Sequence, residues 1–546
     1  QLELQRVNPD YTEGWEVAPN RIAFSHKGYL PDGSKQAISS DMEAEEFELY
    51  RVEDDVAVYK GKVEKCATSN GSFQIMDFTQ YSIPGNYYIK AGERATKPFT
   101  IDKHLWKPSI EKVLNFFYCE RCGTPIEGIH PECHQEFYFE HEGKRIHLDG
   151  GWHDAADLTK KGENPEGIYA MLKLAHHLKN REGTSHLVNK LYKEAIWGLD
   201  WLMKVRFGDG TRFHGSAMRW WQNGIQGDFD DVTRKPKRSR EAFFSGLAAA
   251  VEASSARFLK NRDPERSKKS AELSRKDWTY AMDKLESSPS LMDASVAAWS
   301  SIELYALTGE KKYADKAAEM SSVIVNCQQL DWLKNADHRI SGLFTNDTAR
   351  KQFFRQGHRG AIHRTLIALR RLCEELPNHS EWMDWYAALA IHSEYYQKTM
   401  VKYTAPYQVL PHAIYHTNEA DHYLSLEQIT QGSDLGGGWY LSKLPERGHF
   451  GVLLAESAAL ATAAAMRSDT NAADLVHKQL QWIIGQNPFS QSCMIGEGYD
   501  YPPIYAYSGD FIVGALPVGI KTRPPHDVPF WPTQTCWAYK EVWVHP

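Results

Sequence analysis

Two aspartates three residues apart are the side chains in this sequence whose types and spacing best suit catalysis. Asp154 and Asp157 follow a Gly150-Gly151 turn and precede a segment with helical periodicity. In the first turn of a helix, side chains at this spacing project in the same direction. Two carboxylates that converge on one water can orient it and accept its proton, as a general base must in hydrolysis at an acetal carbon. The alternative is that Asp154 or Asp157 caps the helix.

A cluster of metal-ligand residue types lies just before this pair. Three cysteines and two histidines occur close together: Cys119, Cys122, His130, Cys133 and His134. Thiolate sulfur and imidazole nitrogen suit tetrahedral zinc, and His153, directly before Asp154, is a plausible fourth ligand. The alternative is a loop of reduced thiols and histidines that binds no metal.

Composition excludes several classes of function. A net charge of −7 over 546 residues provides no basic field, so nucleic acid is not an expected partner. No run of eighteen apolar residues occurs, and we expect no transmembrane segment. The eight cysteines are too few for a disulfide scaffold. The chain begins at Gln1 rather than methionine, which suits a processed or trimmed chain.

The periodicity of the sequence changes once, near Trp106. Between residues 21 and 102, short alternating segments such as Phe47–Val52 are separated by turn signals such as Pro84-Gly85-Asn86, a pattern typical of an immunoglobulin-like β-sandwich. After Trp106 the apolar residues follow helical spacing. The helical stripes occur near residues 167–179, 187–202, 242–259, 292–306, 311–327, 360–374, 382–397, 451–466 and 472–485. We expect ten to twelve helices, hardly any strands, and closure into an α/α-barrel.

The string from Leu148 to Asp157 resembles the Gly-Gly-Trp-Tyr-Asp-Ala-Gly-Asp signature of glycoside hydrolase family 9, a cellulase family with inverting chemistry. Segments 24–30 and 77–88 look like the immunoglobulin-like domain of one branch of that family, and segments 197–202 and 484–488 resemble later landmarks in the expected order. The resemblance implies an N-terminal all-β immunoglobulin-like sandwich, residues 1–104, followed by an all-α (α/α)6 barrel, residues 105–546.

The same resemblance implies how the enzyme would work. Asp154 and Asp157 would supply the general base, and Glu541, in a Glu-Val pair, would protonate the leaving oxygen. The alternative for Glu541 is a solvated glutamate near a chain end. A rival donor is Glu456, which interrupts an alanine-rich helical stripe; its position before the Asn-Pro segment favours a surface or buried hydrogen-bonded acid instead.

Metal sites are also implied. Cys122, Cys133, His134 and His153 match a structural zinc site found in some family members with the immunoglobulin-like domain, with Cys119 and His130 as alternative ligands. Calcium occurs in the family as well, and one loop offers three clustered acids: Asp228, Asp230 and Asp231. Three acids on a loop are usually just solvated.

Aromatic loop residues are the candidate sugar platforms, because flat rings stack on sugar faces. Trp220, Trp221 and Trp531 fit this role. Tyr505 and Tyr507 stand where the family often has a His-x-Arg element, so contacts near the cut bond are expected to differ. Ala156 also replaces the usual glycine of the signature.

The resemblance therefore implies an inverting glycosidase that cleaves β-1,4-linked glucan-type poly- or oligosaccharides, and from this function we expect a secreted, periplasmic or cell-surface location. Exo-action is an alternative, including action as an exo-β-glucosaminidase. A non-catalytic carbohydrate-binding protein on the same fold is another, and an epimerase or lyase a third. The oligomeric state is not indicated.

Overall fold

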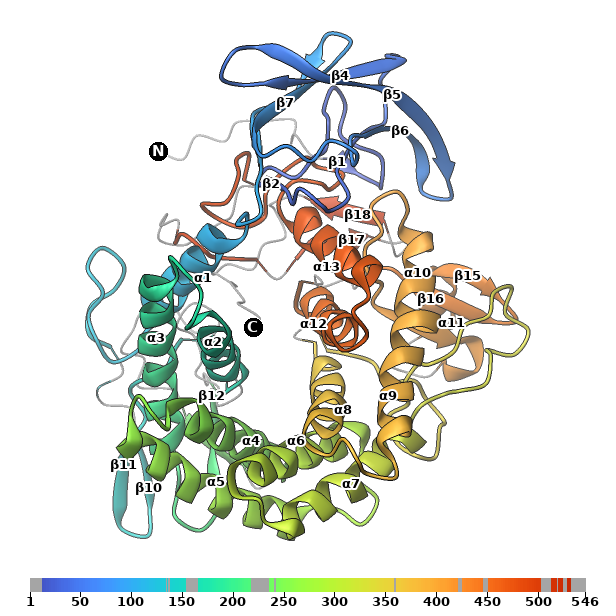
Figure 1. Cartoon of the computed structure of the whole chain (residues 1–546). Coiled ribbons are helices and arrows are strands. Elements are labelled where there is room, and N and C mark those ends of the chain that lie inside the picture. Colours follow the sequence, from blue (N-terminus) through green and yellow to red (C-terminus); the bar gives the residue numbers. More distant parts are fainter. Residues whose placement is uncertain are drawn as a thin grey trace, which may run out of the picture.

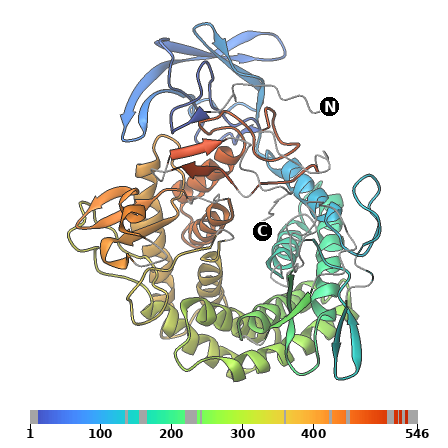
Figure 2. The ribbon, with the colours of Figure 1, turned by 180° about the vertical axis from the view of Figure 1, so that it is seen from behind.

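The computed structural model describes residues 12–133, 135, 138–153, 165–217, 235–239, 242–357, 360–420, 425–444, 450–501, 512–517, 519–523 and 528–531. A β-rich module formed by the N-terminal part of the chain sits at the edge of a ring of helices (Figure 1). The view from behind shows the same ring and the same module (Figure 2).

The N-terminal module is an immunoglobulin-like β-sandwich, as the alternating pattern predicts. Its strands are β2 (Gly28–Tyr29), β3 (Gln36–Ser39), β4 (Glu46–Arg51), β5 (Val56–Thr68), β6 (Gly71–Asp77), β7 (Gly85–Ala91), β8 (Arg94–Ala95) and β9 (Phe99–Ile101). They pair in the order β2-β9-β7-β4-β5-β6-β3, with β8 on β7. The first half of the 13-residue β5 pairs with β4 and its second half with β6, so this strand passes from one layer to the other.

The rest of the chain forms an (α/α)6-type barrel. Its long helices are α1 (Lys107–Cys119), α2 (Pro165–Leu178), α3 (Ser185–Lys204), α4 (Ala242–Leu259), α5 (Pro264–Lys284), α6 (Leu291–Thr308), α7 (Lys311–Asn326), α8 (His363–Glu375), α9 (Trp382–Ile391), α12 (Phe450–Arg467) and α13 (Thr470–Ile483). Within the described ranges α2, α4, α6, α8 and α12 pack side by side as inner helices, and α3, α5, α7, α9 and α13 form the outer layer.

Burial explains which helices lie inside. The inner helices α4, α6 and α12 bury alanine, serine and branched residues on nearly all sides, as a helix enclosed by neighbours must. The outer helix α5 buries only Ser270, Ser274, Asp277 and Ala281. Its start is fixed locally, because the Asp263 side chain accepts a hydrogen bond from the Arg266 backbone N–H and Pro264 occupies the first turn.

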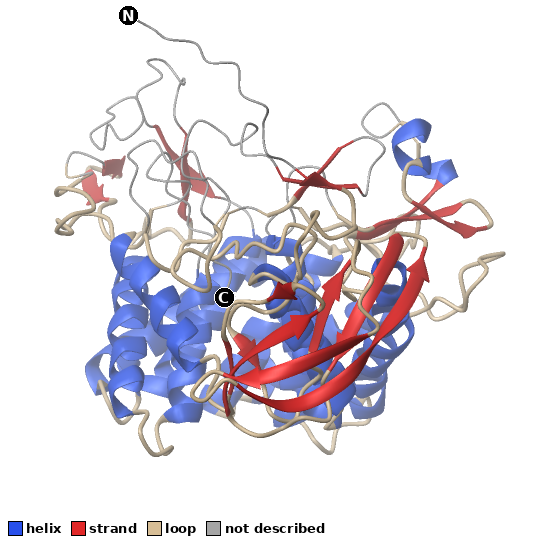
Figure 3. Cartoon of the chain, turned by 90° about the horizontal axis from the view of Figure 1, so that it is seen from above, coloured by secondary structure: helices blue, strands red, loops and turns tan. Residues whose placement is uncertain are grey.

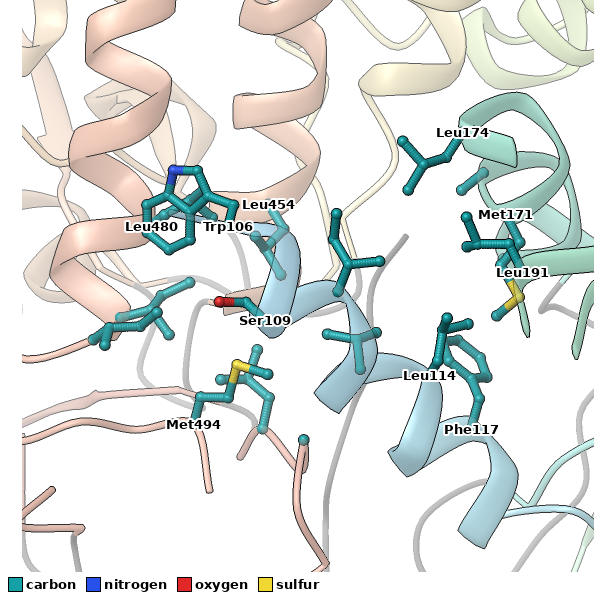
Figure 4. Close-up of a pocket in the computed structure, with 18 residues that line it drawn as sticks. Trp106, Ser109, Leu114, Phe117, Met171, Leu174, Leu191, Leu454, Leu480 and Met494 are labelled. Carbon is teal, nitrogen blue, oxygen red and sulfur yellow. The ribbon is translucent and has the colours of Figure 1, made fainter. Parts of the chain in front are cut away.

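An apolar groove lies between α12 and α2, where no helix of the described ranges completes the inner ring. Its cavity volume is about 350 Å³, and its walls come from α1, α2, α3, α12, α13 and loop residues that follow α13. Figure 4 shows Leu114 on α1, Met171 and Leu174 on α2, Leu454 on α12 and Leu480 on α13 around this space. No helix of the described residues fills it, in contrast to the closely packed interval between α4 and α6.

The helix α12 is also long and apolar enough to cross a membrane by length and composition alone. Of that apolar window, 67% is buried inside the protein. Its apolarity therefore has an explanation in its place as an inner helix of the barrel.

More strands occur in the barrel domain than the sequence predicts. They are β10 (Tyr138–His141), β11 (Lys144–His147), β12 (Arg212–Ala217), β13 (Lys235–Ser239), β14 (Ala413–His416), β15 (Ser433–Gly436), β16 (Trp439–Ser442), β17 (Lys521–Arg523) and β18 (Val528–Trp531), and β1 (Thr12–Glu13) pairs with β18. Each is at most six residues long and lies in a loop, so no stretch is long enough to show a clear period of two. Figure 3 shows several of these short strands and many loops gathered on one side of the helices.

The remaining helical elements of the described chain are short. They are η1 (His392–Gln397, a π-helical turn that continues α9), α10 (Lys398–Met400), η2 (Val401–Thr404), η3 (Thr417–Glu419) and α11 (Leu426–Thr430).

The sandwich and the barrel share a core. Trp15, Ile38 and Phe73 of the N-terminal part belong to the same buried cluster as Trp482 and Ile483 of α13. Polar contacts cross the same boundary.

The His26 backbone N–H donates to the Ile484 carbonyl at 2.8 Å, and the Ser34 N–H donates to the Asp474 carboxylate at 2.7 Å. Lys27 forms an ion pair with the buried Glu497 at 2.9 Å. The two parts are therefore joined by apolar packing and by partly buried polar bonds.

Candidate functional site

One face of α3 holds the segment that leads into the aspartate pair. Glu194, Trp197, Trp201 and Lys204 are spaced so that they share that face. The indole N–H of Trp197 donates to the Gly151 carbonyl at 2.8 Å, and that of Trp201 donates to the Leu148 carbonyl at 3.1 Å.

Lys204 pairs with the Asp149 carboxylate at 2.6 Å. The backbone of residues 148–151 is thus fixed by side chains from a rigid helix.

Trp152 is the anchor of this segment. Its ring N–H donates to the buried Glu194 at 2.8 Å, and Arg121 contacts the same carboxylate through two nitrogens, at 2.9 and 3.2 Å. The Trp152 ring also lies against Gly198, where an added Cβ would come within 2.1 Å of a ring carbon. Only glycine at position 198 allows this ring to pack so closely on α3.

Three of the expected metal ligands lie together next to this anchor. Cys122, Cys133 and His153 are buried, and their ligand atoms all lie within 4.8 Å of one another. The two sulfurs are 3.9 Å apart, and the Cys133 sulfur is 3.3 Å from His153 Nε2. Sulfurs that share a tetrahedral zinc at about 2.3 Å would be about 3.8 Å apart, so the residues fit this metal.

The surrounding groups hold these ligands in place. The backbone N–H of His153 donates to the backbone carbonyl of Glu120 at 2.8 Å, and the backbone N–H of Cys122 donates to the backbone carbonyl of Gly151 at 3.0 Å. The Glu120 carboxylate is 3.7 Å from His153 Nδ1, on the side of the ring away from the sulfurs. A carboxylate at this position is the usual partner of a metal-binding histidine.

The two alternative ligands lie outside the three-atom cluster. His130 Nδ1 is 2.7 Å from the Pro131 carbonyl oxygen, and His130 Nε2 is 3.2 Å from that of Cys119. Burial, together with Glu120 and Glu194, raises the pKa of the Cys119 thiol to about 11, and this favours the protonated form. His134 lies outside the described residues.

An ionic contact joins the first turns of two inner helices that are not neighbours. Glu166, in α2, is 2.9 Å from His363 Nε2 in α8 and also accepts hydrogen bonds from Arg364. Burial opposes ionisation of Glu166, but Arg364 and His363 outweigh it and hold its pKa far below the ordinary value. The contact shows that α2 and α8 begin at the same end of the barrel.

The rival donor Glu456 is a buried hydrogen-bonded acid. It is 3% exposed, and it accepts hydrogen bonds from the side-chain amides of Gln356 and Gln397, both at 2.6 Å. Burial raises its pKa to about 7, although these two amides favour the charged form. Gln356 also accepts hydrogen bonds from the Ala361 and Ile362 N–H groups, which precede α8. Glu456 therefore helps to fix the start of that helix.

Several residues singled out from the sequence lie outside the described ranges. They are Asp154, Asp157, Trp220, Trp221, Asp228, Asp230, Asp231, Tyr505, Tyr507 and Glu541. The backbone of Trp531 belongs to β18, and its side chain is not described.

Sequence reasoning missed the contact of Glu166 with His363 and Arg364. The one available signal was a pair of basic residues at the start of the predicted helix near residue 363.

Comparisons with known proteins agree with this architecture. A family model described as glycosyl hydrolase family 9 matches residues 106–505, and one described as cellulase N-terminal ig-like domain matches residues 18–96. Endoglucanase C of Cellulomonas fimi is 25% identical over 362 residues, which span 54% of this chain and 32% of that relative. The chain thus matches about a third of that relative's length.

Solved structures show the same fold. A single mutant of a thermostable endoglucanase from Alicyclobacillus acidocaldarius has a TM-score of 0.66 at 17% identity, covering 92% of this chain and 90% of that chain. A zinc-binding triple mutant of a family 9 endoglucanase has a TM-score of 0.67 at 17% identity, covering 94% and 96% of the two chains. At such identities these likenesses establish the fold alone.

Proposed function

Since the chain belongs to glycosyl hydrolase family 9 and is a glycoside hydrolase by that membership, we propose that it cleaves β-1,4-linked glucan-type chains with inversion at the anomeric carbon. The observation that supports this proposal is how firmly residues 148–152, which precede Asp154 and Asp157 in the sequence, are held. Residues 148–152 are held by α3 and Arg121, at the end of the barrel where α2 begins. Pre-organisation of this kind is what a catalytic carboxylate pair requires.

Each acid has a separate part in the proposed mechanism. Asp154 and Asp157 orient the attacking water, and Asp157 accepts its proton while the water attacks the anomeric carbon. Glu541 gives its proton to the leaving glycosidic oxygen, so that this bond breaks as the new C–O bond forms on the opposite face of the sugar. The products are a shortened chain and a new reducing end with inverted configuration.

Anomeric proton NMR on β-1,4-linked gluco-, xylo- and glucosamine oligosaccharides tests this mechanism. We expect the α-anomer to appear first from the gluco series, and expect Asp157→Asn and Glu541→Gln to lower kcat by at least a thousandfold with unchanged thermal unfolding. An initial β-anomer, or turnover like that of the wild type in either variant, refutes the assignment.

Substrate contacts are proposed for Trp220, Trp221, Tyr505, Tyr507 and Trp531, because aromatic rings stack on pyranose faces. The tyrosines in place of a His-x-Arg element leave exo-action on short oligosaccharides, glucosaminides included, as the second candidate. The product pattern decides: internal cutting gives a ladder of sizes at early times, whereas terminal cutting gives one small product.

We assign zinc to the cluster of Cys122, Cys133 and His153, with His134 as the fourth ligand. A bound zinc cross-links segment 122–134 to His153. A four-ligand site leaves no position open for a catalytic water. Metal analysis of protein purified without chelator should give about one zinc per chain, and it also reports any calcium bound by the Asp228, Asp230 and Asp231 loop.

The matched variant is Cys133→Ser, with Cys493→Ser as its control, because Cys493 is also buried but lies far from the cluster in sequence. Cys133→Ser should lose the zinc and melt at a lower temperature. At temperatures where the variant is folded, its kcat should stay close to that of the wild type. Full zinc content in Cys133→Ser contradicts the ligand assignment.

Two further proposals concern organisation and location. The domain boundary is placed near residues 104 and 105, between the end of β9 at Ile101 and the start of α1 at Lys107. A polymeric substrate places the working enzyme outside the cytoplasm, in a secreted, periplasmic or cell-surface location. Fractionation of the native producing cells tests that location.

A further inference from the structure

Two large aromatic side chains meet on the surface of the barrel domain. Trp332 and Tyr395 are 42% and 44% exposed, and their rings form an edge-to-face pair with centroids 5.3 Å apart. The residues next to them point inward, since Leu333 and Tyr396 are each 5% exposed. The outward direction of the two rings is therefore set by the anchoring of their neighbours in the core.

The backbone beneath the pair is tightly bonded. Trp332 lies in a loop that closes on itself, because the Gln329 N–H donates to the Leu343 carbonyl at 2.8 Å and the Leu333 N–H to the Ile340 carbonyl at 3.0 Å. Tyr395 lies in the π-helical turn η1, and its carbonyl accepts a hydrogen bond from the Ser341 N–H at 3.4 Å. The backbone that carries the two rings is thus fixed before any ligand binds, which lowers the entropy cost of binding.

The polar groups of the pair are available to a ligand. Within the described part of the chain, neither the Trp332 indole N–H nor the Tyr395 hydroxyl has a hydrogen-bond partner. The Arg339 guanidinium lies 5.7 Å from the centre of the Trp332 ring, and Asp331 is exposed beside it. Flat apolar faces bordered by donors and a carboxylate match a pyranose, which has apolar C–H faces and a rim of hydroxyls.

The pair is not part of the proposed catalytic centre. Trp332 follows the outer helix α7, and Tyr395 continues the outer helix α9, whereas the aspartate pair precedes the inner helix α2. The loop that carries Trp332 leads into α8, which begins at the same end of the barrel as α2. A glucan chain bound at the pair would therefore lie at the end of the barrel where α2 and α8 begin.

We propose that Trp332 and Tyr395, with Arg339 and Asp331, form a surface platform that binds a β-1,4-glucan chain outside the proposed catalytic centre. The choice of ligand rests on the proposed function. The platform raises the local concentration of polymer without taking part in the cleavage, so it matters for long chains and not for short ones.

Native electrophoresis through gels that contain soluble hydroxyethylcellulose measures the proposed binding directly. We expect the polymer to retard the wild-type protein, and expect the dissociation constant from retardation to rise at least tenfold in the double variant Trp332→Ala/Tyr395→Ala. Met383→Ala is the matched control, because Met383 is a 63% exposed apolar residue on α9. It should migrate like the wild type.

Kinetics on a short chromogenic cello-oligosaccharide check that the double variant is folded and has an intact catalytic centre. We expect its kcat and KM there to equal those of the wild type. The ring-preserving variant Trp332→Phe/Tyr395→Phe should keep most of the retardation, and this separates loss of stacking from local unfolding.

Equal retardation of the wild type and the alanine double variant overturns the proposal, as does a wild type that no glucan retards. A change in sedimentation coefficient on mutation, with retardation unchanged, would make the pair a contact between protein copies instead. Retardation that depends on the platform in a protein that cleaves no β-1,4-glucan would refute the proposed function and leave this inference standing.

Discussion

Replacing Glu456 by glutamine should change the pH dependence of stability while hydrolysis is retained. Glu456 is buried against Gln356 and Gln397, and burial raises its pKa from the ordinary 4.5 to about 7. A carboxyl whose pKa is higher in the folded state binds its proton more tightly there than in the unfolded chain. Its stabilising contribution is complete below pH 4.5 and is lost as the pH rises through 7.

The size of this loss follows from the pKa values. One pKa unit corresponds to about 1.36 kcal/mol, so ionisation of Glu456 should cost roughly 3 kcal/mol between pH 4.5 and pH 8. Glutamine does not titrate, so the free energy of unfolding of the variant lacks this part of the pH dependence. The Gln397 side-chain oxygen has no hydrogen-bond partner among the described groups. If the Gln397 amide flips, this oxygen can accept a hydrogen bond from the new side-chain N–H of the variant.

Urea unfolding at a series of pH values measures the free energy of unfolding for both proteins. The contributions of the buried His26 and His412, whose pKa values burial lowers to about 4, are present in both proteins and cancel in the difference. His392 Nε2 lies 3.9 Å from a Glu456 carboxylate oxygen, so the difference reports Glu456 together with this contact. Parallel pH profiles would refute the reasoning about burial. Loss of hydrolysis in a stably folded Glu456→Gln protein would identify Glu456 as the proton donor and overturn the role proposed for Glu541.

Three further predictions concern the supports of the site. Glu194→Ala leaves Arg121 without its buried partner, and we expect urea unfolding to show a loss of about 3–5 kcal/mol. Gly198→Ala places a methyl group against the Trp152 ring and should cost about 1–3 kcal/mol with weaker zinc retention, measured by unfolding and by chelator competition. Glu166 has a depressed pKa, so its contribution is present above pH 4.5 and lost as the pH falls; the melting temperature of Glu166→Gln should therefore lie below that of the wild type at pH 7, with a gap that narrows in acid. A difference in melting temperature that does not change with pH would contradict a stabilising role for the ionised Glu166.

The elements with a clear apolar period could be predicted from the sequence. The stripes near residues 242–259, 292–306 and 451–466 correspond to α4, α6 and α12, whose burial in the ring requires apolar residues. Helix α5 gave no such stripe, because an outer helix with a polar exterior buries only a few small or polar side chains. A helix of this kind is specified by its cap and by its neighbours more than by its own period.

The site could be predicted only where local sequence carries the signal. Cys122, Cys133 and His153 stood out by residue type, and the structure brings their ligand atoms together. Glu166 and His363 are 197 residues apart, and no local pattern reveals that the side chains at the starts of their helices are in contact. The exposure of Trp332 could not be predicted either, since tryptophan is highly buried on average and no local pattern marks this one as exposed.

The shared core of the sandwich and the barrel has a consequence for how the protein can be taken apart. Trp15 and Phe73 are packed with Trp482 of α13, so a barrel expressed alone would present that helix to water as an apolar surface. The N-terminal domain thus covers an apolar surface of the outer helix α13 and is not an independent folding unit. The two domains should melt in a single calorimetric transition, and proteases should find no cleavable hinge between them.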